Sequence, residues 1–248
     1  MRETKFLCPW GETGHQVEML VQRPKVAGLR PAVMLMHGHQ EHPHQPGARW
    51  AVGAGLFRSV NYMGYVAAAV SMPGYGRTGG LPDMCGPRSQ AAVRAGLAHL
   101  RSMDGVDPTR IALCGWSRGA IVSACVAADE PGLCALVLSA GVYDFTDPDV
   151  FIMKEIQEVF FYETELGGRQ AAEDRSALLR ADRITSPTLI LHGDSDERVN
   201  AGQATALHKR LQHLGRRSRL VTFEGAGHAP PRWQEGVEIM TFLKEMLG

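Results

Sequence analysis

The chain has 248 residues, of which 44% are hydrophobic, and its 26 basic and 26 acidic side chains give a formal net charge of zero. This balance provides no long-range attraction to nucleic acid or to anionic membranes, and we expect neither as a partner. No apolar run approaches the roughly 18 residues that span a bilayer, and the charged residues after Met1 do not fit a signal peptide, so we expect a cytoplasmic protein. The length predicts a single domain over residues 1–248, and the oligomeric state stays open.

The cysteines form an odd set of five without CxxC spacing. This pattern predicts reduced thiols and argues against both a disulfide framework and a zinc site. The five residues are Cys8, Cys85, Cys114, Cys125 and Cys134.

The first part of the chain predicts an antiparallel hairpin. Two strand-like stretches, Lys5–Leu7 and Val17–Val21, flank a glycine-rich turn at Gly11–Gly14. We expect this hairpin at one edge of a sheet.

From residue 32 onward the chain repeats a short apolar run, a turn rich in Gly, Pro or Asp, and a helical stretch. This alternation is typical of an α/β fold with a mostly parallel central sheet and helices on both faces. The expected strands are Ala32–Met36, Val66–Val70, Ile111–Cys114, Ala135–Ser139, Thr188–Leu191 and Leu220–Phe223. The expected helices are Ser89–Met103, Arg118–Asp129, Ala201–Leu214 and Arg232–Leu247.

One segment interrupts the alternation between the fourth and fifth of these strands. Asp147–Leu166 is apolar, and Asp147 followed by Pro148 predicts the start of a helix. In a doubly wound sheet such an excursion passes near the carboxyl ends of the strands, where ligands bind. The stretch 144–187 is therefore either a small lid or an ordinary helical covering of the sheet, and the sequence leaves both open.

The pentapeptide GWSRG at residues 115–119 lies directly between the strand Ile111–Cys114 and the helix that begins at Arg118. In this context a GxSxG pattern predicts a strained, tight turn with Ser117 at its tip, because the flanking glycines let the backbones approach. The turn exposes the hydroxyl beside a helix N-terminus, which favours a developing negative charge. Ser117 is therefore the predicted nucleophile, and a non-catalytic glycine-rich connection is the alternative.

A serine hydroxyl is a weak nucleophile at neutral pH and needs a base within hydrogen-bonding reach. Among ten histidines we favour His228, which lies in a loop of small residues after the last expected strand; a surface-loop histidine is the alternative. The base in turn needs a carboxylate that fixes its tautomer. Asp196, just after the strand Thr188–Leu191, is the favoured acid. The alternatives that stay open are Asp194, Glu197 and Asp144.

The three candidates occur in the order Ser, Asp, His, each after a separate strand, and that order is typical of one fold. Over essentially its whole length the chain resembles an α/β-hydrolase, with a likeness to prolyl-oligopeptidase-like catalytic domains and related serine esterases. The segments that carry this resemblance are His37-Gly38, Pro73–Arg77, residues 115–119, His192-Gly193 with Asp196 and Val199, and Gly227-His228.

The resemblance implies an oxyanion hole made of two backbone N–H groups. One belongs to Arg118, after the nucleophile, and the other to the loop after the third strand, where His39 is favoured and Gln40 stays open. Two departures argue against carrying over peptidase activity. We expect no counterpart of the propeller domain of the oligopeptidases, and the oxyanion loop lacks their Gly-Gly-Pro run after histidine.

The loop 37–44 holds four histidines and raises the question of a metal site. Metal sites built from histidine usually draw their ligands from regular elements with supporting hydrogen bonds. This loop instead contains Pro43 and already has the oxyanion role. We therefore expect no bound metal, and no sequence feature indicates a cofactor.

These features predict a serine hydrolase that cleaves carboxylic esters through an acyl-enzyme, with a small-molecule ester or a short peptide as substrate. Two other functions stay open: a small-peptide or amide hydrolase with the same three residues, and a hydrolase fold kept as a binding protein without turnover. The aromatic residues that could line an acyl pocket are Trp50, Tyr75, Trp116, Phe160 and Phe161.

Overall fold

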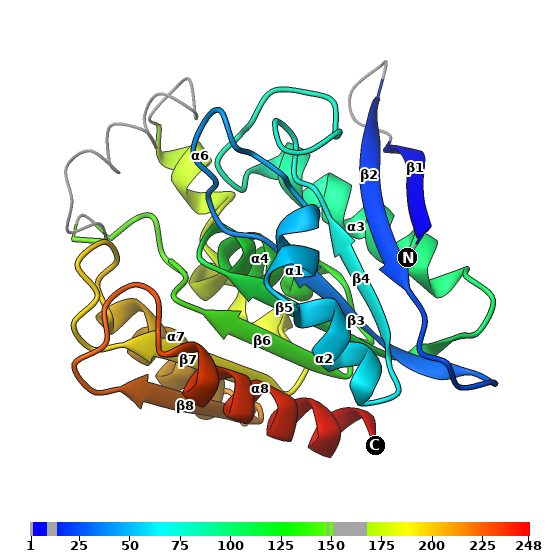
Figure 1. Cartoon of the computed structure of the whole chain (residues 1–248). Coiled ribbons are helices and arrows are strands. Elements are labelled where there is room, and N and C mark those ends of the chain that lie inside the picture. Colours follow the sequence, from blue (N-terminus) through cyan, green and yellow to red (C-terminus); the bar gives the residue numbers. More distant parts are fainter. Residues whose placement is uncertain (1, 9–13, 148, 151–167) are drawn as a thin grey trace.

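Eight strands form one sheet in the order β1-β2-β4-β3-β5-β6-β7-β8 in the computed structural model, which describes residues 2–8, 14–147, 149–150 and 168–248 (Figure 1). The β1–β2 and β2–β4 pairs are antiparallel, and the other five neighbouring pairs are parallel. The strands are β1 (Arg2–Cys8), β2 (His15–Gln22), β3 (Arg30–Met36), β4 (Val66–Val70), β5 (Val106–Trp116), β6 (Ala135–Ser139), β7 (Thr188–Gly193) and β8 (Ser218–Phe223).

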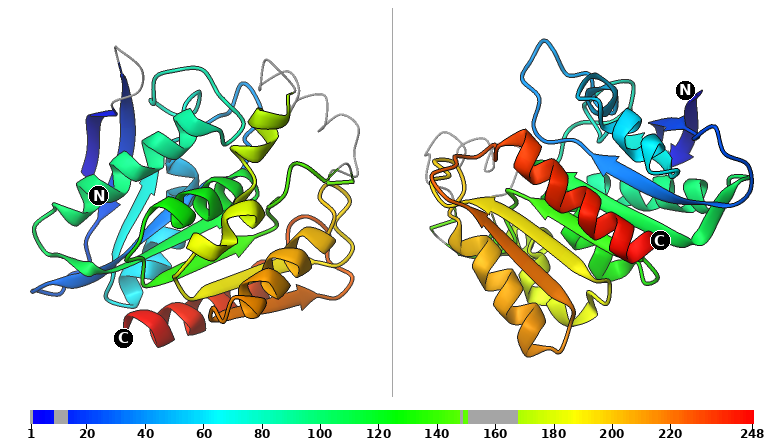
Figure 2. Two further views of the ribbon diagram at one scale, coloured as in Figure 1. Left: turned by 180° about the vertical axis from the view of Figure 1, so that it is seen from behind. Right: turned by 60° about the horizontal axis from the view of Figure 1, so that its bottom comes forward.

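The helices cover both faces of the sheet. The view from behind shows α3, α4 and α7 on the face opposite to α1, α2 and α8 (Figure 2). Within the described residues no helix combines the length and the apolar character needed to cross a bilayer. The helices are α1 (Arg49–Gly53), α2 (Leu56–Tyr62), α3 (Pro87–Arg101), α4 (Arg118–Asp129), α6 (Arg169–Glu173), the 3₁₀ helix η1 (Ala177–Arg183), α7 (Gly202–His213) and α8 (Arg232–Leu247).

Successive strand residues point to opposite faces and build a separate core on each. In β3, Met34 packs in the core that includes α3, α4 and α7, whereas Val33 and Leu35 pack in the core that includes α1, α2 and α8. A strand covered on both faces needs an apolar residue at every position. This requirement explains why the central strands are continuous apolar runs in the sequence.

The predicted fold class is confirmed, including the N-terminal hairpin at the sheet edge and the six later strands. Strand β5 begins at Val106, five residues before the predicted Ile111. The prediction began too late because the first half of the strand is mostly polar and lacks the apolar signal. The sequence analysis missed α1, α2, α6 and η1. Each has only five to seven residues, too few for a helical period to show.

Most of the predicted helix Asp147–Leu166 lies outside the described residues. Within the longer stretch 144–187, the described residues after 167 pack on the rest of the domain, since η1 contacts α4. The buried side chain of Arg175 also donates hydrogen bonds to the carbonyl oxygens of Met84 (2.9 Å) and Asp83 (2.6 Å). A lid formed by 144–187 therefore stays a prediction.

The turn from β5 into α4 depends on two glycines. A Cβ atom on Gly115 would lie 2.1 Å from the carbonyl oxygen of Gly119, and a Cβ atom on Gly119 would lie 2.2 Å from the carbonyl oxygen of Met36. Three backbone segments can meet here only because both residues lack a side chain. Ser117, between them, has a φ of 52°, a left-handed conformation that is strained for a residue with a side chain.

We predict that Gly119→Ala lowers the free energy of unfolding by about 2–4 kcal/mol, because the added methyl group must displace the backbone of Met36. Gly236→Ala in α8 is the matched control. A Cβ atom at Gly236 would meet no atom within 4 Å, so the change should stabilise the protein by about 0.5–1 kcal/mol. Urea unfolding followed by circular dichroism measures both, and equal effects would contradict this explanation of the turn.

Candidate active site

Three side chains from three strand ends form a hydrogen-bonded chain. Ser117 follows β5, Asp196 follows β7 and His228 follows β8. The Nδ1 atom of His228 lies 2.8 Å from Oδ2 of Asp196, and its Nε2 atom lies 3.0 Å from Oγ of Ser117. An ionised carboxylate only accepts hydrogen bonds, so Nδ1 carries the proton and Nε2 accepts from the serine hydroxyl. In this tautomer the imidazole can receive the serine proton.

Asp196 is buried and fixed by several donors. Its Oδ1 atom accepts hydrogen bonds from the backbone N–H groups of Arg198 (2.9 Å) and Val199 (3.1 Å), and Nε2 of His192 lies 3.0 Å from Oδ2. Burial by itself raises the pKa of this carboxyl, but the imidazoles of His192 and His228 and the Arg198 N–H outweigh burial and hold the pKa well below its usual range. Asp196 is therefore ionised at neutral pH.

The three alternative carboxylates face other partners. Oδ1 of Asp194 accepts from the N–H of Gly225 at 2.8 Å, and Oδ1 of Asp144 accepts from the N–H of Thr146 at 2.9 Å. The Glu197 side chain is 61% exposed. Among these four carboxylates of the described residues, Asp196 is the one bonded to the imidazole of His228.

The loop after β3 lies directly against the predicted nucleophile. A Cβ atom on Gly38 would lie 3.2 Å from the Cβ atom of Ser117. The side chains of the two predicted oxyanion residues converge on one hydroxyl: Nδ1 of His39 lies 3.0 Å from the Tyr75 oxygen, and Nη1 of Arg118 donates to it at 3.1 Å. The loop and the first residue of α4 are thus held together beside Ser117.

His37 and Gln40 anchor the two ends of this loop. Nδ1 of His37 donates to the carbonyl oxygen of Gly38 (2.8 Å), and its Nε2 accepts from the N–H of Met72 (3.1 Å). The amide of Gln40 brackets Gly47, donating to its carbonyl oxygen (3.1 Å) and accepting from its N–H (2.7 Å). Because Nε2 of His37 accepts a hydrogen bond from a backbone N–H, the loop is built around a neutral imidazole.

Sequence reasoning missed the positions of Tyr75 and Glu235. It considered Tyr75 as a pocket residue, but the ring contacts the imidazole of His37, with ring centroids 4.8 Å apart. The only sequence signal near Tyr75 is the segment Pro73–Arg77, which is part of the family resemblance. Nothing in the local sequence relates Tyr75 to the loop after β3, because 36 residues separate it from His39.

Glu235 of α8 lies next to the nucleophile's turn. It is 9% exposed, and its Oε1 atom accepts hydrogen bonds from Nε1 of Trp116 (2.9 Å) and Oγ of Ser139 (2.5 Å). Burial raises the pKa of this carboxyl, and the hydrogen bonds from Ser139 and Trp116 oppose that effect. In the sequence Glu235 reads as an ordinary polar residue of a C-terminal helix, and no motif marks it.

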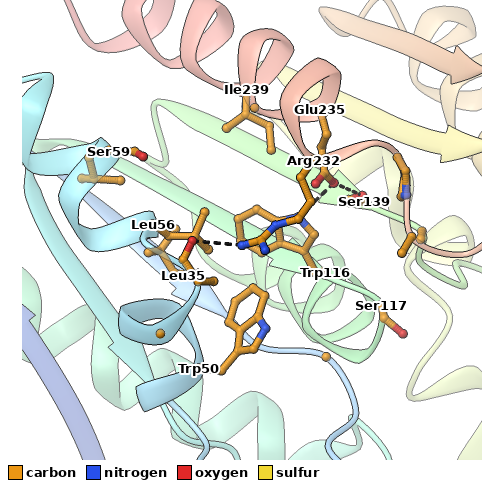
Figure 3. Close-up of a pocket in the computed structure, with 18 of the residues that line it drawn as sticks. Leu35, Trp50, Leu56, Ser59, Trp116, Ser117, Ser139, Arg232, Glu235 and Ile239 are labelled. Carbon is orange, nitrogen blue, oxygen red and sulfur yellow. Dashed lines mark hydrogen bonds between the residues drawn. The ribbon is translucent and has the colours of Figure 1, made fainter.

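A cavity of about 850 Å³ opens at Ser117 and His228 and extends between α1 and α2 on one side and α8 on the other (Figure 3). A volume of this size is typical of ligand sites. Two of the predicted aromatic residues line it, Trp50 and Trp116, whose rings meet edge to face with centroids 5.3 Å apart. Tyr75 does not line it, and the phenylalanines at 160–161 lie outside the described residues.

Known proteins relate this chain to a family of serine hydrolases. The profile of the prolyl oligopeptidase family matches residues 59–248, and the chain belongs to that family. It is 28% identical to the uncharacterized peptidase YuxL of Bacillus subtilis over 130 residues, which cover 50% of this chain and 19% of YuxL.

Two solved structures from Pyrococcus species share the fold. An acylaminoacyl peptidase of Pyrococcus horikoshii matches with a TM-score of 0.78 and 16% identity, over 99% of this chain and 42% of the peptidase. The esterase Pf2001 of Pyrococcus furiosus matches with a TM-score of 0.73 and 17% identity, over 100% of this chain and 93% of the esterase. The chain thus spans less than half of the peptidase and nearly all of the esterase.

We predict that His37 makes the protein less stable in mild acid. Burial lowers the pKa of His37 to about 4, against about 6.5 in an unfolded chain. Between these pH values the unfolded chain therefore binds a proton that the folded protein does not. Stability is fully present above about pH 6.5 and falls toward pH 4, by up to roughly 3 kcal/mol.

Urea unfolding at a series of pH values measures this contribution. His37→Gln should remove the share of this pH dependence that His37 contributes and leave the share of His39, whose pKa burial also lowers to about 4. His213→Gln, at an exposed position of α7, should leave the dependence unchanged. If the His37→Gln protein retained the full dependence, another group would be its source.

Proposed function

We propose that this chain is a carboxylic-ester hydrolase in which Ser117 is the nucleophile, His228 the general base and Asp196 the orienting acid. The observation that supports this most directly is the hydrogen-bonded chain from Ser117 Oγ through the imidazole to Asp196, with contacts of 3.0 and 2.8 Å. A nucleophile, a base and an orienting group in this relation are the usual requirements for acyl transfer by serine.

In the first half of the reaction, Oγ of Ser117 attacks the carbonyl carbon of the ester while its proton passes to Nε2 of His228. The negative charge of Asp196 stabilises the imidazolium that forms. The backbone N–H groups of Arg118 and His39 face the new oxyanion, with Gln40 as the other candidate from the same loop, and the N-terminus of α4 adds its dipole.

In the second half, the proton on Nε2 of His228 moves to the leaving oxygen, the carbon–oxygen bond breaks and the alcohol departs. The acyl group remains on Ser117. A water molecule then attacks the acyl carbon and gives a proton to the same nitrogen. That proton passes to Oγ of Ser117 as the bond between Oγ and the acyl carbon breaks, which releases the acid and restores the serine hydroxyl.

Two observations favour esters over amides. The cavity that opens at Ser117 is lined mainly by apolar side chains, and the chain resembles the esterase Pf2001 over 93% of that protein's length. The amide or short-peptide alternative draws its support from the family match and from the relatives named as peptidases. A binding role without turnover would leave the hydrogen-bonded chain unused.

We predict that a fluorophosphonate labels Ser117 and that the label is absent in Ser117→Ala and His228→Ala. Asp196→Asn should lower kcat on a p-nitrophenyl ester by about 10³–10⁴-fold, because the imidazole loses its tautomeric control. Mass spectrometry with peptide mapping locates the label, and a spectrophotometric assay measures kcat.

Asp194→Asn is the matched control for the acid, since this neighbouring carboxylate accepts from Gly225 rather than from His228. Its kcat should stay within about threefold of the unmodified protein. No label on correctly folded protein would contradict the proposed chemistry and favour the binding role.

We predict a higher kcat/KM, by at least about tenfold, for a p-nitrophenyl ester than for the p-nitroanilide of the same acid. An alcohol leaves more readily than an amine, and the proposed site has only His228 to protonate the leaving group. Both substrates release a coloured product that can be followed at one pH. A preference for the anilide would overturn the ester assignment and leave the nucleophile in place.

A further inference from the structure

We infer that the cavity beside Ser117 is an acyl groove: it holds the hydrocarbon chain of the substrate's acid, so esters of medium-length apolar acids react faster than acetates. This inference rests on the proposed function and names its substrate class. We define the acyl groove as the part of the cavity away from the catalytic centre, between Gly53 of α1, α2 and Met63 directly after α2 on one side and α8 on the other. Its residues in α2 and α8 are Leu56, Ser59, Val60, Gly236, Ile239, Met240 and Leu243.

The groove follows the direction of its two helical walls. The lining residues recur every three or four positions, from Leu56 in α2 to Met63 directly after it, and from Arg232 to Leu243 in α8. This spacing places them on one stripe of each helix, and the two stripes face each other across the groove. The stretch from Arg232 to Leu243 rises roughly 16 Å along the helix axis. The groove is therefore elongated along the two helices, as an extended chain requires.

The polar atoms of the groove are engaged with one another. Trp116 and Ser139 both donate to Glu235, and Oγ of Ser59 turns back to the carbonyl oxygen of Gly55 at 3.4 Å. None of these groups is left to select a polar substituent on the substrate, and burying one there would cost free energy. The surface offered to a ligand is consequently apolar.

Among the described residues, three charged ones line the cavity: Arg49 in α1, and Arg232 and Glu235 in the first turn of α8. Arg232, the first residue of α8, donates from Nη2 to the carbonyl oxygen of Ala54 at 3.0 Å and so bridges the two walls (Figure 3). Beyond Glu235, the described lining residues of α2 and α8 carry no charge. An acyl group with its carbonyl at Ser117 would place its polar end among polar groups and its chain among apolar ones.

A glycine lies on each wall of the groove. Gly53 in α1 and Gly236 in α8 both line it, and a Cβ atom on either would meet no atom within 4 Å. Neither has a positive φ, so the backbone does not require glycine at these positions. Glycine within a helix makes the helix less stable than alanine would. Open space for a ligand gives these residues a function that the fold does not.

The direction of release decides which part of the ester occupies the groove. The alcohol must leave before water attacks, whereas the acyl group stays bonded to Ser117 until the second step. Ser117 and His228 are both partly exposed, so an alcohol on that side departs directly to solvent. The inner side, which leads past Trp116 between the helices, is then the place for the acyl chain.

The test compares p-nitrophenyl esters from acetate to decanoate, below their aggregation limits, with the full chain and its Gly236→Phe variant. Burial of each methylene group should raise kcat/KM by up to about fourfold until the groove is filled. Gly236→Phe should lower the octanoate-to-acetate ratio of kcat/KM by at least about tenfold. Gly53→Phe tests the opposite wall and serves if the first variant does not fold.

Gln234→Phe is the control, because this exposed residue of α8 does not line the groove; its octanoate-to-acetate ratio should match that of the unmodified chain. Acetate hydrolysis without any effect of acyl length would overturn the acyl groove and leave the proposed function standing. Absence of both ester hydrolysis and fluorophosphonate labelling would overturn both.

Two further outcomes would assign the groove to another occupant. Alkyl acetates of increasing alcohol length, with rates that rise while the acyl series stays flat, would show that the alcohol lies there. Exposed apolar residues on α8 run from Trp233 and Val237 to Met240 at the rim of the groove, so sedimentation is measured on the same proteins. A dimer that Gly236→Phe dissociates, with no change in chain-length preference, would make this face an interface and overturn the proposal.

Discussion

The close approach of three backbone segments at the end of β5 is the constraint on which the site depends. Gly115 and Gly119 let the strand turn into α4 while the helix rests on the carbonyl oxygen of Met36 in β3. One contact region therefore fixes the position of Ser117, the start of α4 and the loop after β3. A cost in backbone strain at Ser117 is accepted because the surrounding packing determines the turn.

The polar groups around this turn are separated by environment. Asp196 is held ionised by the donors around it, whereas burial favours the neutral form of Glu235, which is bonded to Trp116 next to the nucleophile. A neutral His37 and the Tyr75 hydroxyl fix the neighbouring loops by hydrogen bonds. Environments that shift the pKa values of similar groups in opposite directions allow each to keep one role at a given pH.

The sequence was sufficient for features that have local signals. Continuous apolar strands predicted the sheet, and GxSxG between a strand and a helix predicted the tight turn around Ser117. The choice of His228 and Asp196 as partners of Ser117 followed from their places after separate strands. Glu235, Tyr75 and the groove could not be predicted in this way, because each depends on the packing of segments distant in the chain. The residues of α2 or of α8 alone do not indicate how the two helices lie relative to each other.

At Gly236 the stability of α8 and the width of the proposed acyl groove have opposite requirements. A side chain there would stabilise α8 and narrow the groove at the same time, so the two properties cannot both be maximised at this residue. Selection for a more heat-resistant molecule and selection for longer substrates would act on the same residue in opposite directions. Because this residue makes no contact with Ser117, His228 or Asp196 in the hydrogen-bonded chain, substrate range can diverge among relatives while the chemistry stays the same.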